Sequence, residues 1–230
     1  MITEKRSDQP VLMNASGKCY SALRKMLVCG QIPVGSRLAE VEWSQRLGAQ
    51  RAALREAMAL LAHDGLLTRR TTGGFFVPTL EEIRYEELID ARIVLELGAI
   101  DVSFAPGAPR KDLTQLHKIC DTMEDLHHSG LTMGFCESDF LFHQKLLELS
   151  KNEILVKMFS HSAQHIYFLA PVPDDVRMQQ EIGVIQEHRQ ILADLNDGNI
   201  KSASDLLRRH IARTKGLLQN ALGGNQRDES

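Results

Sequence analysis

Four side chains in the second half of the chain have the chemistry of metal ligands. Asp139 and His143 are four residues apart, so on a helix they share one face, with Cβ atoms roughly 5–6 Å apart. His188 and His210 fall on two later predicted helices, and antiparallel packing could bring both to the same place. Three imidazoles and one carboxylate bind Zn²⁺, Ni²⁺ or Mn²⁺ and can leave coordination positions open. The alternative is that each is an ordinary surface or hydrogen-bonded core residue, and spacing alone leaves both readings open.

Two arginines have the chemistry of DNA contacts. Arg51 and Arg55 stand one turn apart near the start of a helix predicted over 50–63. The buried stripe of that helix consists of Leu54, Ala57, Met58 and Leu61. Arginine can donate two parallel hydrogen bonds to guanine or clamp phosphates, and the helix N-terminus adds its own positive end. The alternative is an exposed basic turn in which Arg55 pairs locally.

The elements around these arginines are typical of a winged helix-turn-helix. Apolar spacing predicts helices over 17–29, 39–47 and 50–63, with Gly48 as the tight turn between the last two. Strands are expected over 66–70 and 75–78. They flank Gly73-Gly74, where glycines tolerate the positive φ of a hairpin tip. That hairpin would be the wing.

After Pro78 the pattern is wholly helical. Helices are predicted over 81–105, 110–129, 132–149, 152–169, 174–196 and 199–221, separated by Pro- and Gly-containing breaks. The expected fold is therefore mostly α: an N-terminal winged helix-turn-helix, with three helices and a small β-hairpin, followed by an all-α six-helix antiparallel bundle. The expected domains are 10–79, the winged helix-turn-helix for DNA binding, 80–222, the helical domain with the candidate metal ligands, and 223–230, a disordered tail.

Charge is distributed unevenly along the chain. The net charge is -3, but residues 16–79 carry nine Lys and Arg against four acidic residues, which suits a module that faces phosphates. The sequence has neither a membrane-spanning apolar run nor a signal peptide. We therefore expect a cytoplasmic protein without a membrane partner. The four cysteines have no paired spacing and are interpreted as reduced and mostly structural.

The first eighty residues carry a specific resemblance. The stretch Val34-Gly-Ser-Arg-Leu-Ala-Glu, then Trp43-Ser-Gln-Arg-Leu-Gly-Ala-Gln-Arg-Ala-Ala-Leu-Arg-Glu-Ala-Met, then Leu61-Ala-His-Asp-Gly-Leu-Leu and the Gly-Gly wing, resembles the DNA-binding domain of GntR-family regulators. The resemblance implies that Arg51 and Arg55 contact operator DNA and that Gly73 and Gly74 form the wing tip near the minor groove.

This sequence also departs from the GntR pattern. Gln50 occupies a position where the family commonly has a capping Ser or Thr. With Arg37 it completes the expected set of DNA-contacting residues. Ala52-Ala53 replaces a usual Thr-Pro pair and Trp43-Ser44 a Leu-Ala pair. The fold prediction survives these changes, but the operator sequence stays open.

The helical part resembles the FadR-like branch of this family, whose ligand domain is called FCD. The resemblance lies in Arg92-Ile-Val-Leu-Glu96, in Asp139-x3-His143 and in the histidines of the last two helices. It implies that Asp139, His143, His188 and His210 hold a divalent metal, with zinc favoured and nickel or manganese as alternatives. It also implies that Arg92 helps the metal bind the carboxylate of a small metabolite.

Two further points stay open beside this resemblance. The other role for Arg92 is a salt bridge with Glu96 one turn later. His161 and His165 lie outside the family pattern, and we interpret them as pocket or core residues rather than as a rival metal pair.

These features favour a regulator over an enzyme. We expect a homodimer that binds a near-palindromic double-stranded operator and responds to a small organic carboxylate. The alternative is a metal-dependent hydrolase or isomerase with an incidental N-terminal module, but no general base is evident beside the histidines. A third possibility is an architectural DNA-binding protein, in which the four-residue site would be an accident.

Overall fold

The computed structural model describes residues 14–28, 31–71, 73–79, 84–163 and 174–224. In the N-terminal part these form helices α1 (Ala15–Val28), α2 (Glu40–Arg46) and α3 (Arg51–His63), and strands β1 (Arg37–Leu38), β2 (Thr68–Arg69) and β3 (Phe75–Phe76). The strands make an antiparallel sheet in the order β1-β3-β2. The predicted helices and hairpin are confirmed. The third strand, β1, was not predicted, because its two residues show no alternation and its partner β3 is not its neighbour in the sequence.

The N-terminal part has its own hydrophobic core. Helix α1 packs on α3, and the stripe predicted for α3 is buried. Trp43 of α2, the one tryptophan of the chain, is also buried in this core. The turn into α3 is fixed by Gly48 at φ +60° and by the Ser44 hydroxyl, which donates to the Ala49 carbonyl at 2.7 Å. A glycine suits this left-handed position because it has no Cβ.

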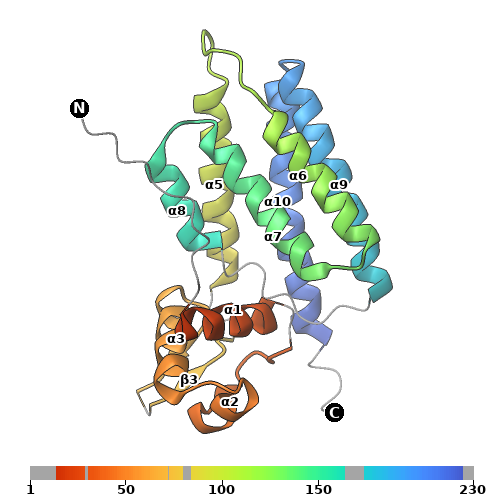
Figure 1. The fold of residues 1–230 in the computed structure, drawn as a ribbon. Helices are drawn as coiled ribbons and strands as arrows, with labels where there is room; N and C mark the ends of the chain where they lie inside the picture. Colours follow the sequence, from red (N-terminus) through yellow and green to blue (C-terminus); the bar gives the residue numbers. More distant parts are fainter. Residues whose placement is uncertain (1–13, 29–30, 72, 80–83, 164–173, 225–230) are drawn as a thin grey trace, which may run out of the picture.

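The rest of the described chain is a helical bundle with a second core. Its helices are α5 (Tyr85–Ser103), α6 (Thr114–His128), α7 (Thr132–Glu148), α8 (Glu153–Ala163), α9 (Asp174–Asn196) and α10 (Ile200–Gly224). Helix α6 packs on α7 and α9, while α5 packs on α7, α8 and α10. Figure 1 shows the N-terminal module at one end of these long helices, with α1 nearest to the bundle. The all-helical prediction is confirmed.

The helix ends match the predictions within a few residues. Helix α5 is preceded by Arg84 at φ +53°. Helix α8 is described only to Ala163, so the remainder of its predicted span lies outside the described residues. Helix α10 continues to Gly224, two residues into the predicted tail. Among the described helices, none has the length and apolar character needed to cross a membrane.

Candidate metal centre and nucleic-acid interface

The four predicted ligands meet at one point inside the bundle. Asp139 and His143 come from α7, His188 from α9 and His210 from α10, and their ligand atoms all lie within 4.8 Å of one another. The Nε2 atom of His210 is 3.2 Å from that of His143 and 3.3 Å from that of His188. The Asp139 carboxylate is 3.4 Å from His188 Nε2 and 3.8 Å from His143 Nε2. The structure thus brings together residues that are far apart in the sequence.

Three of these four separations lie in the range expected for ligands around a single divalent ion, and the fourth, from Asp139 to His143, is slightly longer. Nitrogen and oxygen ligands bind zinc at about 2.0–2.2 Å, which places neighbouring ligands roughly 3.0–3.5 Å apart in tetrahedral or octahedral geometry. The side chains of His143 and His188 are fully buried, whereas Asp139 keeps 17% of its side chain exposed. Three neutral imidazoles and a carboxylate suit zinc, nickel or manganese. The residues present therefore fit a metal site on geometry and on donor chemistry.

A buried carboxylate orients the first imidazole. His143 Nδ1 donates to Glu96 of α5 at 2.6 Å, so that its Nε2 faces the cluster. The other oxygen of Glu96 accepts from Arg92 Nε at 2.5 Å. Glu96 and Arg92 are themselves almost fully buried. A hydrogen bond of this kind fixes both the tautomer and the ring orientation of a metal ligand.

The second imidazole is oriented in the same way and the third by packing. His210 Nδ1 donates to Glu187 at 2.6 Å, and Glu187 also accepts from Arg213. The ring of His188 instead stacks on Phe142, with 3.7 Å between ring centroids and 5° between ring planes. Its buried Nδ1 has no hydrogen-bond partner within the described part of the chain.

Burial favours the neutral form of two of the imidazoles, His143 and His188. Burial, aided by the charge of Arg92, lowers the pKa of His143. Burial and the neighbouring His210 and His143 lower the pKa of His188 well below its ordinary value. Burial alone would raise the pKa of Glu96, but the hydrogen bond from His143 and the charge and hydrogen bond of Arg92 outweigh it and hold that pKa far below the usual range. Neutral imidazoles with an ionised carboxylate behind them are the protonation states that metal binding requires.

Arg92 forms a salt bridge with Glu96, which the sequence offered as an alternative to an effector contact. It is 3% exposed, donates to Glu96 and lies 5.8 Å from the centre of the Phe159 ring. It is therefore linked to His143 through Glu96. Whether it also contacts an effector stays a prediction. Neither the side chain of His161 nor any part of His165 is within the described residues.

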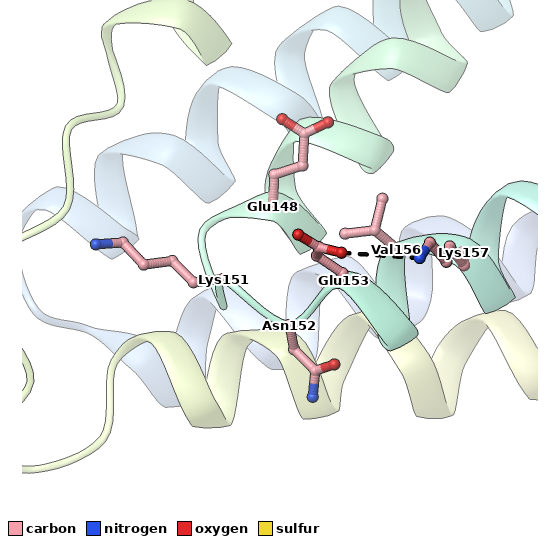
Figure 2. A pocket seen from close by; sticks show the side chains of 6 residues that line it. All are labelled: Glu148, Lys151, Asn152, Glu153, Val156 and Lys157. Atoms are coloured by element: carbon pink, nitrogen blue, oxygen red, sulfur yellow. Dashed lines mark ion pairs between the residues drawn. The ribbon is translucent and has the colours of Figure 1, made fainter. Parts of the chain in front are cut away.

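A surface hollow at the turn between α7 and α8 is a separate feature. Figure 2 shows its lining, in which Glu153 and Lys157 form an ion pair. The lining consists of Glu148, Lys151, Asn152, Glu153, Val156 and Lys157. None of these is a predicted site residue, and charged groups of both signs mix at an open surface. The hollow therefore offers no focused chemistry.

The predicted DNA-reading helix exposes its arginines at its N-terminal end. Arg51 and Arg55 are both exposed, and Arg55 Nε donates to Glu40 of α2 at 2.9 Å, so the local pairing of Arg55 is present. This hydrogen bond and the charge of Glu40 raise the pKa of Arg55. Gln50 is the N-cap of α3, but its side chain makes no capping hydrogen bond. The first N–H groups of α3 therefore lack a side-chain cap, and such groups suit a phosphate.

The wing lies beside two further arginines, Arg37 of β1 and Arg70 of the hairpin itself. Gly73 and Gly74 have φ of +85° and +93°, and a Cβ at Gly74 would lie 3.3 Å from Arg37 Nε. Arg37 and Arg70 both lie over the Phe76 ring, at 6.0 and 4.4 Å from its centre. Both glycines suit the positive φ of the turn, and Gly74 also leaves room for the side chain of Arg37.

Sequence reasoning missed the acidic residues that hold these functional groups in place. Glu187 and Glu40 were not singled out, and Glu96 was considered only as a partner of Arg92. Each glutamate lies on a different helix from the metal-ligand histidine or DNA-contacting arginine that it holds. The spacing of residues along one helix does not reveal such a contact. The adjacency of Glu187 to His188 was the one available signal, and it points to the wrong histidine.

Comparisons with known proteins all lead to bacterial transcriptional regulators. Residues 15–77 match the family described as bacterial regulatory proteins, gntR family, and residues 87–213 match the FCD domain. An uncharacterised HTH-type transcriptional regulator of Bacillus subtilis, YdhC, is 28% identical over 84% of this chain and 85% of its own. The Uxu operon regulator of Haemophilus influenzae is 25% identical over 84% of this chain and 77% of its own.

A solved structure supports the same fold. A putative transcriptional regulator GntR from Rhodococcus sp. RHA1 superposes with a TM-score of 0.70 at 23% identity, covering 90% of this chain and 97% of its own. The matching domains and relatives are regulators and not enzymes.

Proposed function

Because the chain belongs to the GntR family of bacterial regulatory proteins and carries an FCD domain, we propose that it is a transcriptional regulator controlled by a small carboxylate. The carboxylate would bind beside a divalent metal held by Asp139, His143, His188 and His210 and would change the affinity of the winged helix for operator DNA. Zinc is the favoured metal, with nickel and manganese as alternatives. The proposed domains are 10–79 for DNA binding and 80–222 for metal and effector.

The observation that carries this proposal is the convergence of three Nε2 atoms and one carboxylate in the same chain as a winged helix. A bound divalent metal would supply an open coordination position that attracts an anionic oxygen. Asp139, as the partly exposed member, marks the side from which an effector would approach. Arg92, which donates to Glu96 beside His143, is proposed as a second contact for the effector.

Helix α5 is the proposed route between the two functions. It begins shortly after the wing, and it holds Arg92 and Glu96, which contact the metal cluster through His143. A ligand that repositions this helix would change the placement of the DNA-binding module. It can do so only if it binds one arrangement better than the other.

A homodimer would present two DNA-binding modules to a near-palindromic operator. Helices α5 and α8 lie against each other and expose apolar side chains. These are Val94, Val102, Ile154 and Met158. An exposed apolar group of this kind supports burial against a second copy.

The test is a titration of candidate acids into a protein–DNA complex, with wild type and Asp139→Ala compared side by side after measuring metal content. We expect about one divalent ion per chain in wild type, and an acid that changes DNA affinity in wild type alone. An acid that acts equally on both proteins would show that the metal cluster is not the sensor. Metal-free protein after purification in metal-rich medium would remove the cluster from the proposal.

A further inference from the structure

Glu40 restrains the arginine that faces the operator. We propose that Glu40 is a specificity-determining positioning residue, which holds the Arg55 guanidinium so that its two terminal nitrogens read a guanine in the major groove. The inference rests on the proposed binding of operator DNA. It assigns to an acidic residue of α2 a role in reading DNA from α3.

The hydrogen-bond geometry carries this inference. Arg55 uses Nε to donate to Glu40 at 2.9 Å, and no other hydrogen bond of its guanidinium is found in the described part of the chain. The two terminal nitrogens, Nη1 and Nη2, therefore remain as a parallel pair of donors. Such a pair matches the O6 and N7 acceptors of guanine. Arg55 can therefore bind the Glu40 carboxylate through Nε and a guanine through Nη1 and Nη2 at the same time.

Exposure makes the restraint necessary. The side chain of Arg55 is 70% exposed, whereas that of Glu40 is only 27% exposed. A long exposed side chain without an anchor samples many rotamers, and ordering it on binding reduces affinity. Glu40 is a better-fixed group because it starts α2, where the helix N-terminus stabilises a carboxylate. It can therefore order Arg55 before DNA arrives.

The helix-turn-helix holds the two residues at a fixed separation. Helices α2 and α3 pack together, and the Ser44–Ala49 hydrogen bond closes the turn between them. Arg55 lies beside Leu54, which is fully buried in the module core. The distance from Glu40 to Arg55 therefore depends on the rigid part of the module and not on a loop.

The charge of Glu40 gives the restraint a measurable signature. A carboxylate near the DNA backbone repels phosphates, so Glu40 weakens binding to DNA in general. Once Glu40 is removed, Arg55 can turn to any nearby phosphate, which adds a sequence-independent contact. We therefore expect weaker discrimination together with stronger binding to non-operator DNA.

The experiment selects preferred sites from a random double-stranded DNA library with the full-length protein. Wild type, Arg55→Ala, Glu40→Ala, Glu40→Gln and Glu42→Ala are compared, and the bound pools are sequenced. Glu42→Ala is the matched control, because it removes the same charge from an exposed position of the same helix. Thermal unfolding of each variant verifies folding, which loss of an ion pair with one largely exposed partner should affect little.

We expect wild type to select a half-site with a guanine preferred at one position. Arg55→Ala should abolish the preference at that position. Glu40→Ala should weaken the preference at that same position by about tenfold, within the range of one bidentate contact. Glu40→Gln, which keeps an acceptor oxygen, should fall between. For a fixed non-operator duplex, Glu40→Ala should also steepen the dependence of log K on log salt by about one unit, as one extra phosphate contact would.

Three results would overturn the inference. Glu40→Ala could match Glu42→Ala at the Arg55 position, or it could weaken every position of the half-site equally, as a general loss of structure would. Its salt dependence on non-operator DNA could also stay that of wild type. A different result, in which wild type enriches no sequence at all, would overturn the proposed regulatory function. The three results above would overturn only the role of Glu40.

Discussion

Two of the three imidazoles in the cluster are aligned by the same device. In each, Nδ1 donates to a glutamate that is paired with an arginine: His143 with Glu96 and Arg92, and His210 with Glu187 and Arg213. The arginine keeps the glutamate ionised, and the glutamate keeps Nε2 directed at the cluster. Metal affinity should therefore depend on residues that never touch the metal.

Glu96→Gln should weaken binding of the divalent ion without unfolding the bundle. The amide loses the charge that favours the Nδ1–H tautomer of His143, and loss of such a partner typically costs about 10–100-fold in affinity. Competition with a zinc chelator measures the change. Glu87→Gln, which removes an exposed carboxylate on the same helix, is the control, and equal affinities for the two variants would contradict this role of Glu96.

Acid should destabilise the protein once metal has been removed. Burial holds the pKa values of His143 and His188 below their ordinary 6.5, so below about pH 6.5 the unfolded chain binds protons that the folded chain does not. Stability then falls as pH drops, by up to about 1.4 kcal/mol per pH unit for each histidine. Urea unfolding of chelator-treated protein at several pH values from 7.5 to 5.5 measures this slope. It should be shallower in His143→Gln, and a stability that rises toward pH 5.5 would refute the assignment.

At the scale of elements, the hydrogen bond between Tyr20 and Asp64 ties α1 to the end of α3. The Tyr20 hydroxyl donates to the carboxylate at 2.6 Å, and burial together with Asp64 raises the pKa of Tyr20 to about 12. The contact joins the first helix of the DNA-binding module to the residue that ends its recognition helix. It therefore helps to set how α3 is presented.

Tyr20→Phe should destabilise the N-terminal module by about 1–2 kcal/mol, because the ring still packs while a hydrogen bond to a charged group is lost. Trp43 makes this measurable, since the one tryptophan of the chain lies in that module's core. Urea unfolding followed by tryptophan fluorescence reports on it. Far-ultraviolet circular dichroism, dominated by the bundle, should change little, and an unshifted fluorescence midpoint would show that the contact is dispensable.

The elements were largely predictable from the sequence, whereas the site was predictable only in part. Helix periodicity and glycine breaks located α2, α3 and α7 within a few residues, because these signals are local. The pair Asp139 and His143 followed from one-turn spacing. Expected antiparallel packing made His188 and His210 candidate partners, and the family resemblance then favoured them as metal ligands. The roles of Glu96 and Glu187 depend on how separate helices pack, which no local pattern encodes.

At the scale of the whole molecule, a direct contact joins the two halves. Arg24 of α1 donates to Glu137 of α7 at 2.6 Å, and Glu137 lies two residues before the metal-ligand candidate Asp139. Helix α7 therefore contacts the DNA-binding module and contributes to the cluster through residues that are only two positions apart. We propose this contact as a second route for the proposed coupling, beside the one through α5.

Reversing one charge of this pair should weaken the effect of metal on DNA affinity. The pair is 25% and 50% exposed, so it contributes at most about 1 kcal/mol, and coupling should fall by a factor of up to about five. DNA affinity is measured with metal-loaded and chelator-treated protein for wild type, Arg24→Glu, Glu137→Arg and the double variant. The quantity compared is the ratio of DNA affinity with metal to DNA affinity without it. The double variant should recover the wild-type ratio, because the two charges again attract. If the single variants keep the full ratio, coupling runs through α5 alone, and if the double variant stays as weak as the singles, the residues act separately and not as a pair.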